Sequence, residues 1–405
     1  MFNPNIVRHS YRHYREARTH YDQMDTFSTT HEGVVYHCPL DKKKRINLAR
    51  QSVNKQFLPW LELANPHIVH VGVTTYCNLS CPACPVGIGE LGRPSEHLKF
   101  DTYCKMVDEL RGSLLFLLFW DWGEPFLHPH LFEMISHANK SQIRTVTSTN
   151  LSMKLTDVKI EEIITSGLDH LIVCIDGIDQ TAHQAYRRGS RLHQLLENLE
   201  GIVSAKTRSN SLYPMIEIRT LATRQNEKQF GRILQLAEEI GAQMYSVKNV
   251  RPFDFRGRNL DHEIVPKNPA LARYDYTDET SPDPQNRLPG TGKFNCGKPF
   301  YAPTLNSDGN LVFCSYVDRD EEIYGDISKS FSKIWKHKSS RRKRMIFGRL
   351  EGTQTCEKCF FRVVHRPTVP CTVPLDDFPP GLSLENKLTK EEFLTLVEQV
   401  RPSSV

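Results

Sequence analysis

Apolar stretches of strand length alternate with amphipathic stretches of helical length between residues 67 and 248. Six stretches are buried-strand patterns rich in branched or aromatic residues, at residues 67–75, 113–120, 143–148, 170–175, 215–222 and 243–248. Five stretches have helical periodicity, at residues 101–112, 130–140, 156–167, 191–206 and 227–241. Asp101 and Thr156 are the expected N-caps of the first and third of these helices. Alternating strands and helices predict parallel β-α units and an α/β fold.

Six units are too few for a closed eight-stranded barrel, which usually needs about 250 residues. We therefore predict a partial, open (β/α)6 barrel over residues 66–250. In folds of this kind the reactive groups lie where the strands end and the loops begin. Motifs that directly follow the strands are therefore the candidates for chemistry.

The rest of the chain divides by composition. We predict an N-terminal basic extension at 1–65, a linker rich in Pro, Asp and Arg at 251–293, a small second domain at 294–375, and a tail with a short helix at 376–405. The basic run Asp41 to Arg45 is interpreted as a solvated loop before a helix, with a nucleic-acid patch as the alternative. A basic amphipathic helix is expected at 330–348, as a solvated face or a docking surface for an electron donor.

Composition is that of an ordinary globular protein, with 39% hydrophobic and 24% charged residues among 405. No apolar run reaches the length of about 18 residues that predicts a membrane span, and the N-terminus lacks an apolar signal core. We expect a cytoplasmic protein, in which thiols stay reduced. The eleven cysteines are then better interpreted as metal ligands than as disulfides. A net charge of +5 is too small to predict nucleic-acid binding.

Three cysteines follow the first predicted strand, in the sequence TTYCNLSCPACPVG. Cys77, Cys81 and Cys84 have the spacing C-x3-C-x2-C, with no fourth cysteine nearby. A structural zinc site needs four ligands, commonly from two CxxC pairs, and is the less favoured alternative. Three thiolates can instead hold three irons of a four-iron, four-sulfur cluster and leave the fourth iron open.

This motif, placed after the first strand of a β/α barrel, resembles the radical S-adenosylmethionine (radical SAM) enzymes. The resemblance implies a cluster whose open iron binds the amino and carboxylate groups of S-adenosylmethionine. It also implies reductive cleavage of that cofactor to a 5′-deoxyadenosyl radical, which removes a hydrogen atom from the substrate. The protein part of such chemistry is to orient and shield the cofactor.

Four further motifs match positions that line the cofactor pocket in that family. Trp122-Gly123-Glu124-Pro125 resembles the Gly-Gly-Glu-Pro turn that meets the methionine amino group, with Trp122 in place of the first glycine. The resemblance extends to Ser148 and Asn150 after the third strand and to Asp176 after the fourth. Arg187 or Arg188 matches the arginine that can pair with the cofactor carboxylate, and both could equally be solvated helix charges. Those cofactor-binding candidates are Gly123, Glu124, Pro125, Ser148, Asn150, Asp176, Arg187 and Arg188.

One departure from the family concerns adenine binding. The residue before the third cysteine is often aromatic in the family, and here it is Ala83. Packing against adenine must then come from elsewhere, and Val247 on the sixth strand is a candidate.

A second cysteine set follows the predicted linker, at Cys296, Cys314, Cys356 and Cys359. Its layout resembles the SPASM/Twitch extension of radical SAM enzymes, which carries auxiliary iron–sulfur clusters. The longer form has seven cysteines, but His365 and Val369 stand at two of the further positions and only Cys371 follows. We predict the shorter Twitch form with one auxiliary 4Fe-4S cluster; a zinc ribbon is the alternative.

Two reactions fit this scaffold. The first is two-electron oxidation of a small polyol or amino sugar, as in the aminocyclitol dehydrogenase that the single-cluster form resembles. The second is modification of a peptide or protein side chain. A non-catalytic iron–sulfur or zinc scaffold is a third possibility, and it would produce no 5′-deoxyadenosine. We favour a small-molecule substrate and a reducing partner such as flavodoxin or ferredoxin, with no membrane or nucleic-acid partner.

The catalytic base stays unassigned from the sequence. Candidates to line the substrate site are Glu217 and Arg219 on the fifth strand, and Lys248, Asn249 and Arg251 at and after the sixth. Strand alternation places Glu217 and Arg219 on one face. A buried salt bridge or a cofactor-binding pair is an equally good interpretation of these two residues.

Overall fold

The computed structural model describes residues 4–56, 64–250, 264–267, 271, 298–315, 322–348 and 371–398. Its centre is formed by the six predicted strands: β3 (Ile68–Val71), β4 (Phe116–Phe119), β5 (Arg144–Thr149), β6 (His170–Cys174), β7 (Met215–Ala222) and β8 (Met244–Asn249). Each pairs in parallel with the next in chain order. In the described residues the sheet does not close on itself, so the prediction of a partial, open barrel is confirmed.

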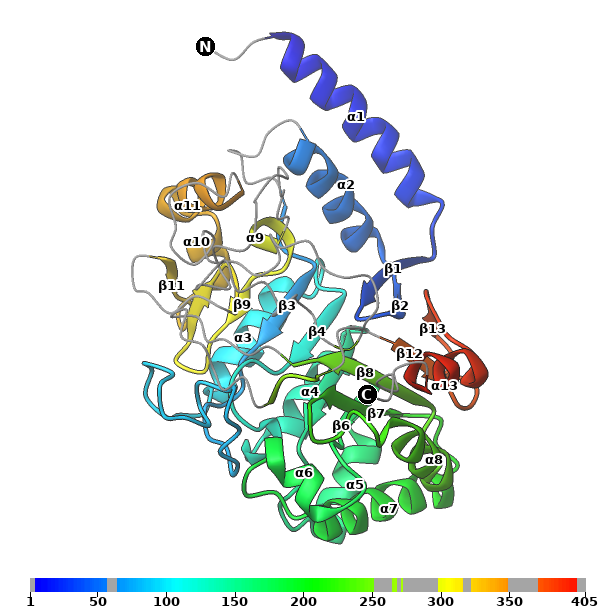
Figure 1. The fold of residues 1–405 in the computed structure, drawn as a ribbon. Coiled ribbons are helices and arrows are strands. Elements are labelled where there is room, and N and C mark those ends of the chain that lie inside the picture. The colour runs from blue at the N-terminus through cyan, green and yellow to red at the C-terminus, as the bar shows by residue number, and fades with distance from the viewer. Residues whose placement is uncertain are drawn as a thin grey trace, which may run out of the picture.

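The helices that connect these strands cover the outer face of the sheet (Figure 1). Five of them were predicted: α3 (Phe100–Leu110), α4 (Leu131–Asn139), α5 (Asp157–Thr165), α7 (Leu192–Arg208) and α8 (Phe230–Ile240). A sixth, α6 (Gln180–Tyr186), is a seven-residue helix that the periodicity did not predict. Thr156 caps α5, because its side chain accepts a hydrogen bond of 3.2 Å from the Lys159 amide. The Asp101 cap was wrong, because α3 begins at Phe100 and Asp101 lies in its first turn.

Short strands from the C-terminal part of the chain extend both edges of the sheet. β9 (Thr304–Leu305) pairs in parallel with β3, and β10 (Asn310–Val312) and β11 (Ile323–Asp326) continue outward from β9. β12 (Cys371–Pro374) pairs with β8 at the opposite edge. The second part of the chain is therefore joined to the barrel by backbone hydrogen bonds.

The expected helix at 330–348 is divided in two, α10 (Phe331–Trp335) and α11 (Lys338–Gly348), and α9 (Lys298–Tyr301) precedes them. Trp335 is fully buried, and its indole donates to the Ala64 carbonyl over 3.1 Å. The guanidinium of Arg344 lies 4.0 Å from the centre of the Trp335 ring. The break lets α11 fold back over this tryptophan, so part of the basic helix packs inward.

The N-terminal extension is more structured than its weak periodicity predicted. It forms α1 (Pro4–Asp22), the hairpin β1 (Thr26–His31) and β2 (Val34–Pro39), and α2 (Lys42–Gln56). β13 (Leu382–Leu384) from the tail pairs with the free edge of β2, and α13 (Lys390–Glu398) is the expected tail helix. Figure 1 shows α1 at the edge of the molecule, alongside α2, with the hairpin beside β13.

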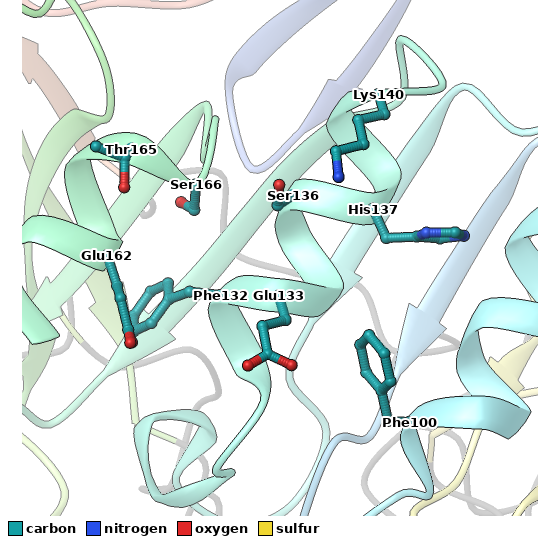
Figure 2. Close-up of a pocket in the computed structure, with 9 residues that line it drawn as sticks. All are labelled: Phe100, Phe132, Glu133, Ser136, His137, Lys140, Glu162, Thr165 and Ser166. Atoms are coloured by element: carbon teal, nitrogen blue, oxygen red, sulfur yellow. The ribbon is translucent and has the colours of Figure 1, made fainter.

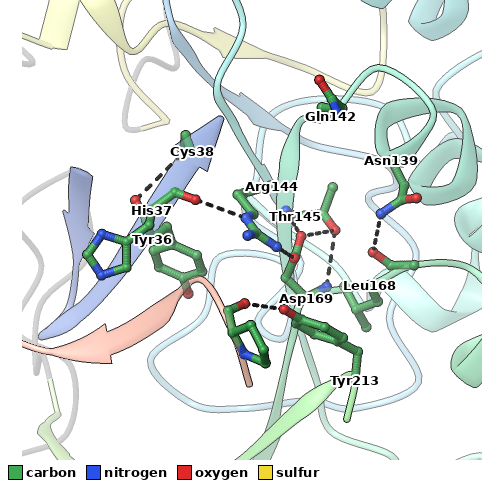
Figure 3. A network of polar contacts seen from close by, with 12 residues as sticks. Tyr36, His37, Cys38, Asn139, Gln142, Arg144, Thr145, Leu168, Asp169 and Tyr213 are labelled. Carbon is green, nitrogen blue, oxygen red and sulfur yellow. Dashed lines mark hydrogen bonds and ion pairs between the residues drawn. The ribbon is translucent and has the colours of Figure 1, made fainter. Parts of the chain in front are cut away.

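The hairpin covers the inner face of the sheet. Tyr36 packs against Phe116 at a ring-centroid distance of 4.3 Å, and its hydroxyl lies 2.6 Å from Nδ1 of His170. The base of the hairpin is fixed by Arg144, which donates to the His37 carbonyl and lies 2.5 Å from Asp169 (Figure 3). Two separate hydrophobic clusters result, one between sheet and helices and one between sheet and hairpin.

The basic run Asp41 to Arg45 was wrongly interpreted as a solvated loop. Lys42 to Arg45 form the first turn of α2, and Asp41 accepts a hydrogen bond from the Lys44 amide. The Lys44 side chain is buried and donates to the carbonyl oxygens of Ser141 and Gln142. Its ammonium serves to hold the N-terminal segment against the barrel.

Candidate cofactor site and substrate site

The three cysteines lie in one loop after β3 and pack around a shared small apolar cluster that includes Leu79 and Tyr186. The loop is tightly folded, since the Cys84 amide donates to the Cys81 carbonyl over 3.2 Å. A Cβ atom added at Gly87 would lie 2.4 Å from that same carbonyl oxygen, so only glycine fits there. The sequence therefore forces the chain back on itself directly after the third cysteine.

Burial makes these thiols hard to ionise. It raises the pKa of Cys77 to about 11 and that of Cys81 to about 12, and it raises the pKa of Cys84 as well. The positive charge of Arg187 acts in the opposite direction on all three thiols. A bound cationic centre would favour the thiolates further, as metal ligation requires.

The donor set fits a cluster better than a single ion. Within the part of the chain that the structure describes, no three His, Cys, Asp or Glu residues are grouped closely enough to hold one metal ion. Three cysteine thiols on one short loop, packed around one apolar cluster, supply the ligand type that iron–sulfur clusters take. The residues present thus fit an iron–sulfur cluster with one iron left without a protein ligand.

The turn at Trp122 to Pro125 lies against the start of the cysteine loop. Gly123 has a φ of +103°, and a Cβ atom there would lie 2.4 Å from the Thr74 carbonyl oxygen. The Glu124 amide donates to the Tyr76 carbonyl over 2.8 Å, and Pro125 opens the short 3-10 helix η1 (Pro125–Leu127). This glycine is therefore required for the close approach of the two loops.

Glu124 is buried and its carboxylate is held by backbone amides. Its side chain accepts hydrogen bonds from the amides of Phe126, over 3.1 Å, and of Asn150, over 2.8 Å. The Asn150 side chain in turn donates to that of Asn78, inside the cysteine loop, over 2.9 Å. Ser148 is half-buried on β5, two residues before Asn150. These hydrogen bonds connect the loops that follow β3, β4 and β5, so the three loops form one site.

Asp176 and Arg187 form the opposite wall of this site. Arg187 Nε lies 2.7 Å from Asp176 Oδ2, and Oδ1 accepts the Leu221 amide over 2.7 Å. Arg187 is the arginine that acts on the cysteine thiols, whereas Arg188 is exposed and contributes its backbone carbonyl to the Ser80 amide. The structure therefore distinguishes Arg187, which faces the cysteine loop, from Arg188, whereas the sequence alone could not choose between them.

Glu217, Arg219 and Lys248 lie together on the inner face of β7 and β8. Arg219 Nε is 2.7 Å from Glu217 Oε1, and His170 Nε2 is 3.0 Å from Glu217 Oε2. Burial opposes ionisation of Glu217, but Arg219 and His170 hold its pKa at about 2. The prediction that Glu217 and Arg219 lie on one face of the strand is confirmed, and so is the alternative that they form a buried ion pair. Asn249 lies elsewhere and donates to the Leu271 carbonyl, and Arg251 is outside the described residues.

Two residues of this inner site come from the N-terminal hairpin, and neither was among the candidates predicted from the sequence. Glu32 at the hairpin tip lies 2.5 Å from Arg219 NH1 and 4.0 Å from Lys248 Nζ. His31 is half-buried and packs against Trp120, at a ring-centroid distance of 5.4 Å. The available signal was Glu32-Gly33 between two strand-like stretches, which is a hairpin-turn pattern.

Asp121 is another residue that the sequence did not single out. It directly follows Trp120 after β4, its side chain is buried, and it lies 3.4 Å from Arg93 NH2. Burial raises its pKa to about 7 despite the charge of Arg93, and its carboxylate acts electrostatically on Cys84. A buried carboxyl group that titrates near neutral pH can accept a proton.

Val247 does not line the cofactor site. It belongs to the cluster that packs between sheet and helices, because strand alternation directs it away from the inner face. The expectation that Val247 packs against adenine was therefore wrong.

Of the second cysteine set, Cys314 lies within the described residues, after β10. Cys296, Cys356 and Cys359 lie outside them. Ser315, next to Cys314, accepts a hydrogen bond of 3.0 Å from the indole of Trp122. The tryptophan that departs from the family turn thus connects that turn to the loop of the second cysteine set.

A separate groove of about 330 Å³ lies on the outer surface between α3, α4 and α5 (Figure 2). Its lining combines Phe100 and Phe132 with Glu133, His137 and Lys140. This groove is on the helical side of the sheet, away from the cysteine loop.

Comparison with known proteins defines the class. Residues 71–237 match the family model of the radical SAM superfamily, and residues 296–360 match that of an iron–sulfur cluster-binding domain, SPASM. The chain therefore belongs to the radical SAM superfamily, and it is a member with a C-terminal SPASM domain. A 4Fe-4S cluster, S-adenosylmethionine and auxiliary iron–sulfur binding follow from this membership. In the described residues no helix is long and apolar enough to span a membrane.

The individual relatives are distant. The chain is 27% identical over 183 residues to an AdoMet-dependent heme synthase of Methanosarcina barkeri, covering 45% of this chain and 50% of that relative. The chain thus spans half the length of this relative. It is 25% identical over 319 residues to a PqqA peptide cyclase of Bradyrhizobium diazoefficiens, covering 74% of this chain and 80% of that one.

Solved structures support the fold. SuiB of Streptococcus suis bound to S-adenosylmethionine superposes with a TM-score of 0.53 at 14% identity, over 72% of this chain and 70% of that one. At this identity the likeness concerns the fold alone.

Proposed function

We propose that this radical SAM enzyme is an oxidoreductase that removes a hydrogen atom from a small polar substrate of the polyol or amino sugar type. The observation that carries the proposal is that the N-terminal hairpin closes one end of the inner site and so forms its floor. The hairpin fills the sheet's inner face below Glu32, and Arg219 and Lys248 surround that glutamate with buried charge. A floor of this kind suits a small polar molecule better than an extended chain.

Different residues of the chain would bind the cluster and position the cofactor. Cys77, Cys81 and Cys84 would hold the cluster, which supplies the electron that cleaves S-adenosylmethionine to a 5′-deoxyadenosyl radical. The turn Gly123-Glu124-Pro125, with Ser148 and Asn150, would position the methionine part of the cofactor. Arg187 would pair with its carboxylate through the guanidinium nitrogens that Asp176 does not use.

The oxidation needs a destination for one proton and one electron. Asp121 is the proposed proton acceptor, because its side chain is buried, its Oδ1 has no hydrogen-bond partner among the described residues, and burial raises its pKa to about 7. Cys296, Cys314, Cys356 and Cys359 are proposed to hold one auxiliary 4Fe-4S cluster that receives the electron. Flavodoxin or ferredoxin would supply the electron for cofactor cleavage.

The test uses anaerobically reconstituted protein with S-adenosylmethionine, reductant and a panel of polyols and amino sugars. We expect a product that has lost two hydrogens, with one 5′-deoxyadenosine formed per product. Cys314→Ala should stop oxidation while 5′-deoxyadenosine still forms, and Cys104→Ala, on α3, is the matched control. Oxidation at the normal rate by folded Cys314→Ala would mean that the electron goes elsewhere.

A second candidate is modification of a peptide side chain. It is favoured by the PqqA peptide cyclase, which matches this chain over 319 residues. A deuterated cell extract, separated by size, distinguishes the two candidates. Deuterium that enters 5′-deoxyadenosine from the small-molecule fraction supports the first, and deuterium from the peptide fraction supports the second.

A further inference from the structure

The tip of the N-terminal hairpin places a carboxylate between two largely buried cations. Glu32 Oε2 lies 2.5 Å from Arg219 NH1 and 4.0 Å from Lys248 Nζ, and the Lys248 ammonium also donates to the Glu32 carbonyl over 3.4 Å. The side chains of Arg219 and Lys248 are only 13% and 12% exposed. Burial lowers the pKa of Lys248, and the negative charge of Glu32 opposes that effect.

This pair of cations lies directly beside the cofactor site. Leu221, two residues after Arg219, donates its amide to Asp176, the partner of Arg187. Across the β7–β8 pairing, Leu221 is the partner of Lys248. The hydrogen bond from the Leu221 amide to the Asp176 carboxylate therefore connects the wall of the cofactor site to the strand segment that carries Arg219 and faces Lys248.

Glu32 differs from an ordinary buried counter-ion in two respects. Its side chain is 35% exposed, about three times as much as the side chains of the two cations that it contacts. It also has a φ of +52°, in the left-handed region that side-chain-bearing residues rarely adopt. Arg219 has Glu217 as a second carboxylate partner, whereas among the described residues Glu32 is the carboxylate within 4.0 Å of the Lys248 ammonium.

We propose that Arg219 and Lys248 form a carboxylate-binding subsite, which Glu32 occupies in the substrate-free protein and which a carboxylate of the substrate takes over. This inference rests on the proposed function and narrows the substrate to a small polar molecule that carries an acid. The substrate's acid replaces Glu32 at the same two cations, and the hairpin tip moves away as the exchange occurs. Removing the Glu32 carboxylate leaves a buried ammonium and an anion-sized space.

The first test measures carboxylate binding with the full chain and needs no cofactor cleavage. Glu32→Ala removes the side-chain carboxylate, and free acetate can take its place beside the two cations. Acetamide has nearly the same shape as acetate and no charge, so it serves as the control ligand. We expect acetate, at constant ionic strength, to raise the melting temperature of Glu32→Ala and to bind it at least about tenfold more tightly than wild type. Acetamide should have no effect. Glu32→Ala/Lys248→Met should lose the response to acetate.

The second measurement keeps the wild-type chain, in case Glu32→Ala does not fold. Hydrogen–deuterium exchange at residues 26–39 should increase with added propionate and stay constant with propionamide. The subsite is wrong if acetate fails to stabilise folded Glu32→Ala, or if the Lys248→Met double variant responds equally. It is also wrong if propionate leaves exchange in the wild-type hairpin unchanged. Since these readouts omit S-adenosylmethionine, their failure would leave the proposed oxidation untouched.

Discussion

The indole nitrogen of Trp122 donates a hydrogen bond to the backbone carbonyl of Ser315 over 3.0 Å. Trp122 begins the turn that carries Glu124, and Ser315 follows Cys314 of the second cysteine set. The strand β9, paired with β3, brings these two loops together across more than 190 residues of sequence. The Trp122–Pro125 turn and the SPASM domain are thus joined by a side chain that the family turn lacks.

Trp122→Phe keeps an aromatic ring but removes the indole N–H and with it this hydrogen bond, which is worth about 1 kcal/mol. We expect hydrogen–deuterium exchange at residues 304–315 to rise and S-adenosylmethionine to bind several-fold more weakly to the reconstituted protein. Trp335→Phe is the matched control, because it also loses one indole hydrogen bond, to the Ala64 carbonyl. Equal cofactor affinity in Trp122→Phe and wild type would exclude a positioning role for Trp122.

Arg187 and Arg188 should differ sharply on substitution. Arg187→Gln leaves the buried Asp176 carboxylate without its cation, which typically costs about 3–5 kcal/mol. Arg188→Gln changes an exposed side chain and should alter the free energy of unfolding by at most about 0.5 kcal/mol. Urea unfolding of both variants checks this. Comparable losses would mean that the Arg187–Asp176 pair does not stabilise the site.

The barrel could be predicted from the sequence because β3, β4 and β6 are short, largely apolar runs buried on both faces. Val69, Leu117 and Val173 are all fully buried, and each lies in a stretch too short and too apolar for a surface helix. The cysteine loop could be predicted for a different reason, since C-x3-C-x2-C lies within eight residues. Local signals of this kind need no knowledge of long-range packing.

The contribution of the N-terminal hairpin to the inner site could not be predicted, because its partners are distant in sequence. Glu32 and Arg219 are separated by 187 positions, from their residue numbers, and nothing local marks Glu32 as a partner of β7. The buried Lys44 was misinterpreted for the same reason: its acceptors are the carbonyls of Ser141 and Gln142. Charged residues in an N-terminal segment look solvated until the tertiary fold supplies their acceptors.

Acid should destabilise the hairpin through His31. Burial lowers the pKa of His31 to about 4, below its usual value of about 6.5, so the unfolded chain binds the proton more readily. Its contribution to stability is present above pH 6.5 and is lost as the pH falls towards 4. Between pH 7 and 5.5 the loss from this one residue is about 1 kcal/mol.

His31→Phe keeps a ring against Trp120 and removes the titration. The difference in unfolding free energy between pH 7 and 5.5 should therefore be about 1 kcal/mol smaller than in wild type, as measured by urea titration at both pH values. His130→Phe is the control, because His130 is exposed on the helical side of the sheet. An unchanged pH dependence in His31→Phe would show that His31 is protonated in the folded protein.

The iron content tests the number of auxiliary clusters. With four cysteines in the second set, the reconstituted protein should contain about eight irons per chain, since each cubane holds about four. About twelve irons would mean two auxiliary clusters, and about four irons with one zinc would mean a zinc ribbon. Metal analysis of wild type beside Cys314→Ala identifies which metal the second set holds.

The most direct measurement is 5′-deoxyadenosine formed from S-adenosylmethionine by anaerobically reconstituted, reduced protein. Wild type should form it, and the variant with alanine at Cys77, Cys81 and Cys84 should form none while it retains the iron of the auxiliary site. Cys104→Ala should behave as wild type, since that cysteine lies on α3 outside the loop. Formation of 5′-deoxyadenosine by the triple variant at the wild-type rate would contradict the assignment of the cysteine loop as the catalytic cluster site.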